Sequence, residues 1–469
     1  KINTKQSHLC IAWHTNGLLD PCHVVLTRKG HFVIGARHDL VTRPVIRFWA
    51  KRFSVQPVIR QAELLRGGCT EEEAAMLNAR SLRRLSSGLS QNLSCVLFPE
   101  GTSHSSSHLI RFRTGAARVA LVAKSLSKSN DSLPPKILPI GLHYRVRHLH
   151  RTDVWIEVGE PFIIEEEGHT EDQTEKISKG EWVEPNSESV HKLRDSMKHQ
   201  LEPLTPNAPD WQTHRAWHLL GHLIFKKSLQ KPKTWKDEVT CARKISNKLR
   251  QLDQSDSSQS SQLIRKSINV SNTLHRQGLD GRDLQIKKGV VRFNKLSIFN
   301  KLLLIPFKLI LGLLTLPVTL ISSGFQIAFG FAQGNKTDEG EDARATFQFL
   351  FSMLGSLIVW PVIALLSITI WWLLSAFELV SSPLIFSIKG SIYAEIFSII
   401  VSSIVLSLGL LLIFYISARF TFFGVDAWMD IRRSVWRRRL NQKMGEEVLQ
   451  ECEDILSLSD SLNLHTILR

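Results

Sequence analysis

The sequence has few cysteines, and their spacing argues against two classes of protein. No two of them are paired or spaced as metal ligands, which disfavours a disulfide scaffold and a Cys₂His₂-type zinc site. Several lie in apolar runs, where a thiol behaves as a small hydrophobic group. We therefore expect a reduced catalytic portion that faces the cytosol. The six cysteines are Cys10, Cys22, Cys69, Cys95, Cys241 and Cys452.

The sequence also lacks the Gly-x-Ser-x-Gly elbow of serine hydrolases, so the serines at 105–107 are not interpreted as a nucleophile. Two groups of histidines could suggest a metal site, but helix-start spacing explains the first group and strand alternation explains the second. We predict no metal site and no bound cofactor. The two groups are His104 with His108, and His143, His148 and His150 with Asp153.

Acidic residues are the minority charge. Lys and Arg number 59 against 43 Asp and Glu, a formal net charge of +16. This excess favours an anionic partner, either nucleic acid or a lipid surface. Long apolar runs near the C-terminus favour lipid, and the arginine-rich stretch 432–439 directly follows one of them. We therefore predict a bilayer with anionic lipids as the partner, and no nucleic acid.

Residues 1–165 alternate short β-like runs with helix-like ones, which predicts one α/β domain with a mixed sheet and flanking helices. Thr70 and Glu73 form a capping box at the start of one helix. The chain begins at Lys1 and not at Met, so we expect a segment upstream of it. The predicted strands are 9–13, 31–36, 55–59, 94–98, 137–144 and 154–158. The predicted helices are 42–53, 70–85 and 114–123.

Residues 166–295 are predicted to form a polar helical region and linker. Helix-like stretches lie at 211–230 and 236–252. The Ser/Gln/Asp-rich tract at 253–262 has too few apolar residues for us to expect it to order itself.

A region predicted to span residues 296–424 contains three charge-free runs, near 309–335, 345–377 and 396–418. Each reaches the ~20 apolar residues that a helix needs to cross a bilayer. A soluble helical bundle would carry a charged face that these runs lack. The sequence therefore predicts an α-helical transmembrane region, followed at 425–469 by a basic cytosolic tail.

The charges around these runs do not agree with three simple crossings. The flank before the first run is purely basic and the tail after the last is arginine-rich, so both are predicted to be cytosolic. Three crossings would place them on opposite sides. One run is therefore expected to be re-entrant or a hairpin, with the helix broken at a proline: Pro306, Pro317, Pro361 or Pro383.

The first strand-like run stops at His14, and Asp20 follows six residues later. An imidazole that takes a proton from a hydroxyl, with a carboxylate fixing its tautomer, is a general base. The alternative is that both are ordinary turn residues. Six residues correspond to about 240° on a helix, so the two side chains meet only through a turn or a helix start, for which Asn16 and Gly17 are suitable.

The strand-like run 94–98 is followed by Pro99 and then by Glu100, Gly101, Thr102 and Ser103. This stretch suits either a helix cap or a ligand cradle. In a cradle, Gly101 allows close backbone approach and Glu100 accepts from a substrate hydroxyl. Thr102 and Ser103 donate to an oxyanion or a phosphate. Three arginines are solvated charges or phosphate ligands: Arg60, Arg111 and Arg113.

Four ordered blocks of this sequence resemble the glycerolipid acyltransferase (PlsC-like) family. Five residues separate His14 from Asp20 where most of the family has four, and Ser103 stands where many lysophosphatidate enzymes have Arg. Both features are similar to the fungal-type glycerol-3-phosphate/dihydroxyacetone-phosphate sn-1 acyltransferases. The blocks are WHTNGLLDP at 13–21, QPVIR at 56–60, FPEGTSHS at 98–105 and ILPIG at 137–141.

The resemblance implies that His14 deprotonates an acceptor hydroxyl, which attacks an acyl thioester directly, and that Asp20 orients His14. It implies that Arg60, Glu100 and Gly101 bind glycerol phosphate. Arg113 is a candidate for a second phosphate or CoA contact.

The function it implies is transfer of an acyl group from acyl-CoA or acyl-carrier protein to the sn-1 hydroxyl of glycerol 3-phosphate, with dihydroxyacetone phosphate as a second acceptor. This is the first step of phospholipid and triacylglycerol synthesis, in the endoplasmic reticulum membrane of a eukaryote or the inner membrane of a bacterium. A 1-acylglycerol-3-phosphate acyltransferase and a catalytically silent membrane scaffold of the same fold are the alternatives.

Overall fold

The computed structural model describes most of the chain, which divides into two compact units. The N-terminal unit comprises residues 1–214, 233–243 and 339–343, and the C-terminal unit comprises 215–232, 244–338 and 344–469. The described residues are 6–27, 30–41, 47, 50–52, 54–58, 70–149, 151–227, 234–253, 258–295, 297, 299–336, 340–385, 388, 391–439 and 442–468.

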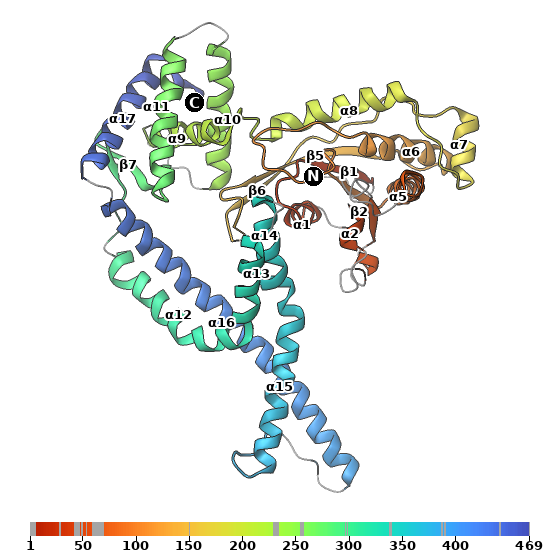
Figure 1. Ribbon diagram of the computed structural model, residues 1–469, viewed down its shortest axis with the longest axis vertical. Coiled ribbons are helices and arrows are strands. Elements are labelled where there is room, and N and C mark those ends of the chain that lie inside the picture. Colours follow the sequence, from red (N-terminus) through yellow and green to blue (C-terminus); the bar gives the residue numbers. More distant parts are fainter. Residues whose placement is uncertain are drawn as a thin grey trace. The chain divides into compact units, whose positions relative to one another are not determined.

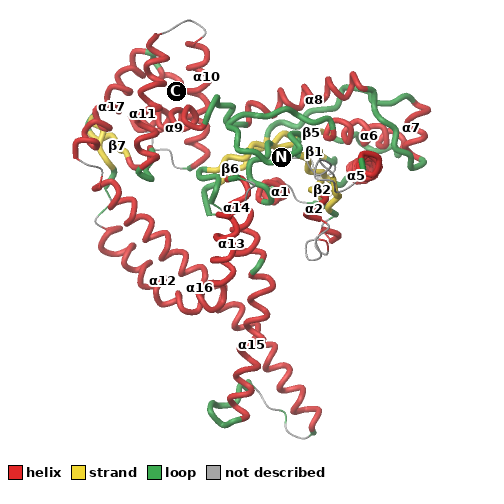
Figure 2. Tube along the Cα trace, in the orientation of Figure 1, coloured by secondary structure: helices red, strands yellow, loops and turns green. Residues whose placement is uncertain are grey.

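A six-stranded sheet forms the centre of the N-terminal unit (Figures 1 and 2). Its order is β3-β2-β4-β1-β5-β6, and every neighbouring pair is parallel except β5 and β6. The mixed α/β sheet is the fold predicted from the sequence. The strands are β1 (His8–Ala12), β2 (Phe32–Arg37), β3 (Val55–Val58), β4 (Ser94–Leu97), β5 (Lys136–Tyr144) and β6 (Val154–Val158).

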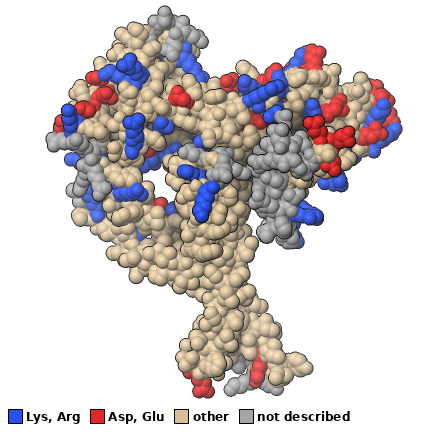
Figure 3. Space-filling view, in the orientation of Figure 1, with Lys and Arg blue, Asp and Glu red and all other residues tan. Residues whose placement is uncertain are grey.

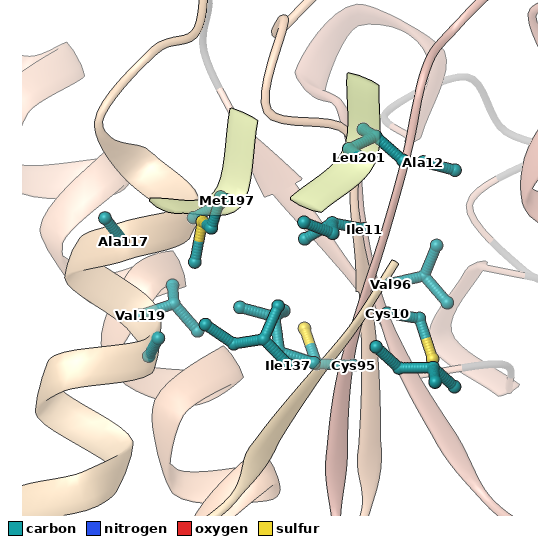
Figure 4. Close-up of a cluster of buried hydrophobic side chains, with 14 of the residues drawn as sticks. Cys10, Ile11, Ala12, Cys95, Val96, Ala117, Val119, Ile137, Met197 and Leu201 are labelled. Carbon is teal, nitrogen blue, oxygen red and sulfur yellow. The ribbon is translucent and has the colours of Figure 1, made fainter. Parts of the chain in front are cut away.

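Helices cover the sheet and enclose an apolar core. Figure 4 shows Ala117 and Val119 of α6 and Met197 of α8 beside side chains of the central strands. The predicted capping box at Thr70 is present at the start of α5. Most of the predicted helix 42–53 lies outside the described residues. The helices of this unit are α1 (Leu19–Val25), α2 (His38–Val41), α5 (Glu71–Ser90), α6 (Gly115–Ser129), α7 (Glu171–Ser178) and α8 (Ser187–Leu201).

The N-terminal unit extends past residue 165, where the sequence predicted the domain to end. Helix α8 belongs to the same core as the sheet, because four of its side chains are buried there. Their spacing of three or four residues places them on one face of the helix. Residues 166–200 are rich in acidic side chains, so the sequence-based prediction assigned them to a polar region and did not recognise this apolar stripe. The four residues are Val190, Leu193, Met197 and Leu201.

The outer strand β6 is tied to β5 and to the first part of α10 (Trp235–Asp253) by an ion-pair cluster. The Glu157 carboxylate accepts from Arg243 Nη1 at 2.8 Å and lies 3.0 Å from His143 Nε2. Burial alone would raise the pKa of Glu157, but hydrogen bonds from Arg243 and His143 outweigh it and lower the pKa to about 2. The ionised Glu157 therefore stabilises this edge of the sheet.

The C-terminal unit contains a helical layer and a β-hairpin formed by β7 (Leu284–Lys287) and β8 (Val290–Phe293). The expectation of an unordered tract at 253–262 is wrong for 258–262, which form the first residues of α11 (Ser258–Arg276). Buried serines at helical spacing extend the apolar stripe of α11, so its N-terminal turn packs although few of its residues are apolar. The layer also includes α9 (Trp211–Lys227), most of which lies in this unit, and α17 (Gln442–Ser461).

Three helical spans in the part of the chain that the structure describes are long and apolar enough to cross a membrane: Asn300–Lys336, Ala343–Ala376 and Ile392–Arg437. Each span contains one of the three runs predicted from the sequence, except that the second span ends at Ala376, one residue before the end of its predicted run. The spans consist of α12 (Ile305–Thr319), α13 (Phe325–Lys336), α14 (Glu341–Phe349), α15 (Ser356–Ala376) and α16 (Ile392–Arg439), joined within the first two by π-helical turns.

Three of the four named prolines lie within helices that they do not end, contrary to the sequence-based expectation, and Pro383 lies outside a helix, after the end of α15. Pro306 lies in the first turn of α12, and α12 and α15 continue through Pro317 and Pro361. The α-helical hydrogen-bond pattern of the first span is interrupted instead three residues after Pro317, at the π-helical turn Leu320–Gly324. Figure 3 shows the hairpin of α15 and α16 as a surface almost free of charge up to its tip.

Candidate active site

The carboxyl ends of three adjacent strands bring the candidate residues together. Strand β1 lies between β4 and β5 and is parallel to both. His14 follows β1 by two residues, Glu100 follows β4 by three, and Tyr144 is the last residue of β5. Open α/β sheets bind ligands at this edge.

His14 and Asp20 form a hydrogen-bonded pair. His14 Nδ1 lies 2.9 Å from Asp20 Oδ2. A carboxylate can only accept, so Nδ1 donates and Nε2 is the ring nitrogen left to take a proton. The Asp20 side chain is fully buried, whereas that of His14 keeps 17% of its surface exposed. The His14 ring also stacks on Phe98, with centroids 4.1 Å apart and planes at 17°.

A tight turn closes the five-residue spacing between the pair. The Asn16 carbonyl accepts from the amides of Leu19 at 2.8 Å and Asp20 at 3.1 Å, and helix α1 begins at Leu19. Gly17 within the turn has a φ of +23°. The sequence predicted either a turn or a helix start between His14 and Asp20, and the structure contains both.

Asp20 is held by more donors than the histidine alone. The amides of Thr15 and Asn16 each donate to Oδ2 at 2.7 Å. Tyr144 donates its hydroxyl to Oδ1 at 2.6 Å. Charge-assisted bonds of this kind are roughly twice as strong as neutral ones. They fix the carboxylate in one rotamer, and with it the orientation of His14.

Sequence reasoning missed Tyr144 and His23. The single Tyr144 proton goes to Asp20, so the phenol oxygen accepts from His23 Nδ1, 3.0 Å away. Burial, and then the charge and hydrogen bond of Asp20, raise the pKa of Tyr144 well above its ordinary value. Burial lowers the pKa of His23, although Asp20 opposes this. The phenol therefore keeps its proton and remains a donor.

Glu100 faces the protein and not the solvent. Its side chain has no exposed surface. Oε2 accepts from the His14 amide at 2.8 Å, and Oε1 accepts from the Ile110 amide at 3.0 Å and lies 2.8 Å from His104 Nε2. The predicted contact with a substrate hydroxyl does not fit this geometry, because the Glu100 carboxylate is buried and both of its oxygens face protein donors. Glu100 instead connects the ends of β1 and β4.

The turn after Glu100 presents polar groups at the surface. Gly101 has a φ of +73°, and a Cβ there would lie 3.1 Å from Arg113 Cγ, so the arginine stem lies against this glycine. The Arg113 amide donates to the Pro99 carbonyl at 2.7 Å. Arg113 and Thr102 are exposed and Ser103 is half-buried. Arg111 is exposed two residues earlier, and the predicted Arg60 lies outside the described residues.

Comparison with protein families supports the same interpretation of this edge. Residues 1–143 match the family model described as Acyltransferase. This range contains His14, Asp20 and the turn between them, as well as Glu100 and Arg113. The N-terminal unit therefore carries an acyltransferase-family domain of the PlsC-like type.

Two curated relatives, both from Saccharomyces cerevisiae, resemble part of this domain. Glycerol-3-phosphate O-acyltransferase 1 is 28% identical over 159 residues, which are 34% of this chain and 19% of that protein. Glycerol-3-phosphate O-acyltransferase 2 is 31% identical over 121 residues, which are 25% of this chain and 14% of that protein. The chain thus matches less than a fifth of the length of either relative.

Proposed function

We propose that the chain is a membrane-bound acyltransferase that moves an acyl group from an acyl thioester to the sn-1 hydroxyl of glycerol 3-phosphate. The observation that carries this proposal is the His14–Asp20 pair, with Nδ1 committed to the carboxylate and the ring partly exposed. The acyltransferase domain gives the reaction class, and the names of the yeast relatives favour glycerol 3-phosphate as the acceptor.

In the proposed reaction, His14 Nε2 takes the proton of the acceptor hydroxyl as its oxygen attacks the thioester carbonyl carbon. The C–S bond of the tetrahedral intermediate then breaks, and the imidazolium returns the proton to the leaving thiolate. Asp20 stabilises the imidazolium between these two steps. No covalent acyl-enzyme forms in this scheme, because the acceptor oxygen itself attacks the thioester and no side chain acts as a nucleophile.

The phosphate of the acceptor is proposed to bind at the turn after β4. Arg113 supplies a guanidinium suited to bidentate phosphate binding, and Thr102 and Ser103 supply hydroxyl donors. Gly101 lets the backbone approach the ligand without a Cβ in the way. Arg60 is a second cation proposed from its position in the sequence. Glu100 positions the two loops and does not contact the substrate.

The proposal is tested with membranes that contain the full chain, a radiolabelled acyl-CoA and, separately, three acceptors: glycerol 3-phosphate, dihydroxyacetone phosphate and lysophosphatidate. We expect the highest kcat/KM with glycerol 3-phosphate. Preference for lysophosphatidate would contradict the acceptor assignment while leaving acyl transfer intact. Absence of transfer to all three acceptors, from acyl-CoA and from acyl-carrier protein, would favour the silent scaffold.

A further inference from the structure

The first apolar span packs against the α15–α16 hairpin, and its contacts show where the span changes direction. Its first half, α12, lies along the C-terminal half of α16. Gly312 and Gly424 are in direct contact, since a Cβ on Gly312 would lie 2.7 Å from Gly424 Cα. Thr319, seven residues later in α12, contacts Thr421, three residues earlier in α16, with 2.8 Å between their Oγ1 atoms. The two helices therefore run antiparallel.

The span bends at the π-helical turn Leu320–Gly324, which we call the elbow. Figure 1 shows the chain reversing direction between α12 and α13. At the elbow, Trp360 of α15 donates its indole N–H to Ser323 Oγ at 2.9 Å. The same indole packs edge-on against Phe414 of α16, with centroids 6.3 Å apart. These two residues mark the level that the elbow reaches on the hairpin.

After the elbow, α13 returns along α14. A Cβ on Gly330 would lie 3.1 Å from the Phe347 carbonyl oxygen, and one on Gly334 would lie 3.1 Å from the Arg344 carbonyl oxygen. As the chain advances along α13, its contacts therefore move back towards the start of the second span. The first span ends on the same side of the elbow as it began.

Beyond the level of the elbow, the hairpin continues as two paired helices. Trp372 of α15 donates to Ser403 Oγ of α16 at 3.0 Å. At ~1.5 Å per residue, residues 361–376 and 392–413 rise about 24 Å and about 33 Å. A bilayer has a hydrocarbon core of about 30 Å. The longer stretch exceeds this thickness, and the shorter one needs to span only the part of the core that remains beyond the elbow, so the paired helices can reach the far side.

The outer surface of the elbow suits hydrocarbon and not water. Leu320, Ile321 and Phe325 are 58%, 71% and 81% exposed. The polar residues of the elbow point inward, where Ser322 and Ser323 are buried. Exposed large apolar residues around a buried polar interior are typical of a segment inserted among lipid chains.

We propose that the first apolar span is a re-entrant segment: it enters and leaves the bilayer on one side and turns within it at the elbow. Only α15 and α16 then cross. The basic flank before residue 300 and the arginine-rich end of α16 lie on the same side, as the positive-inside rule requires, and residues 377–385, which follow α15, lie on the other. This assignment goes beyond the proposed reaction and does not depend on it.

Four single-cysteine substitutions at exposed positions test the assignment: Lys295→Cys, Lys336→Cys, Ser381→Cys and Glu447→Cys. Each full-length variant is labelled in sealed vesicles with a membrane-impermeant maleimide, before and after detergent. Peptide mass spectrometry separates the new thiols from native cysteines. We expect positions 295, 336 and 447 to react from one side and position 381 from the other.

Opposite sidedness of positions 295 and 336 would mean that the first span crosses, which would overturn the proposal. Equal sidedness of all four positions would overturn the crossing of α15 and α16. The elbow has its own test, a spin label on Ile321→Cys. We expect its relaxation to respond to dissolved oxygen and not to a water-soluble nickel chelate. A stronger response to the chelate would place the elbow at the surface and contradict re-entry.

Discussion

Replacing Asp20 with Asn separates the charge of this carboxylate from its hydrogen bonds. Two backbone amides and His14 Nδ1 all face the position of Oδ2. An Asn side chain must therefore place its oxygen there, which keeps the His14 tautomer. Its NH₂ then faces Tyr144, whose hydroxyl can reverse and donate to His23. We expect Asp20→Asn to fold and to retain the geometry of the site.

What Asp20→Asn loses is the attraction between the carboxylate and the imidazolium. Two unit charges about 4 Å apart interact by about 4 kcal/mol at an effective dielectric constant of ~20. At ~1.4 kcal/mol per factor of ten, kcat should fall about 10³-fold. The steady-state acyl-transfer assay measures this directly. Asp20→Ala should be less active still, and less stable, because it leaves both amides without an acceptor.

Two results would contradict a role for the Asp20 charge. A fall of less than tenfold would mean that no charge develops on His14 in the rate-limiting step. Asp20→Asn as inactive and as unstable as Asp20→Ala would mean that the oxygen does not take the position facing the amides.

Three further perturbations give distinct outcomes. Tyr144→Phe removes one charge-assisted bond to Asp20 and should lower kcat about tenfold with KM for both substrates unchanged; a change confined to KM would assign Tyr144 to substrate binding. Glu100→Gln must turn an NH₂ group towards a backbone amide, because each Glu100 oxygen accepts from one, so thermal unfolding in detergent should show a loss of about 1.5–3 kcal/mol, whereas the exposed control Glu160→Gln should show none. The Glu157 pKa is lowered by folding, so its contribution is complete above its ordinary pKa and is lost as the pH falls towards about 2; the stability of the wild type should fall between pH 5 and pH 3 more steeply than that of Glu157→Gln, and parallel curves would contradict the ion-pair account.

Much of the fold is encoded in local patterns. Apolar runs at 94–98 and 137–144 became β4 and β5, and Thr70 with Glu73 formed the expected capping box. The meeting of His14 with Glu100 followed from two strand ends at one edge of a parallel sheet. Such predictions succeed because periodicity and capping depend on neighbours in the sequence.

The missed features depend on residues far apart in the chain. Tyr144 lies 124 positions from Asp20, and no local signal connects a tyrosine at a strand end with that carboxylate. Glu100 has the sequence context of a substrate ligand, but its side chain turns inward to two amides. The elbow at 320–324 follows from packing against Trp360 and α16, whereas the sequence indicated breaks at the prolines themselves. In each case tertiary contacts decided the outcome.

We propose His14 as the base for acyl transfer, and a comparison of two alanine variants tests this role. His14→Ala and the control His108→Ala, an exposed histidine near the same loop, are assayed in membranes with acyl-CoA and glycerol 3-phosphate at matched expression. We expect a loss of at least about 10²-fold for His14→Ala, as for the removal of a general base, and wild-type activity for His108→Ala. Equal activity of the two variants would remove His14 from the mechanism.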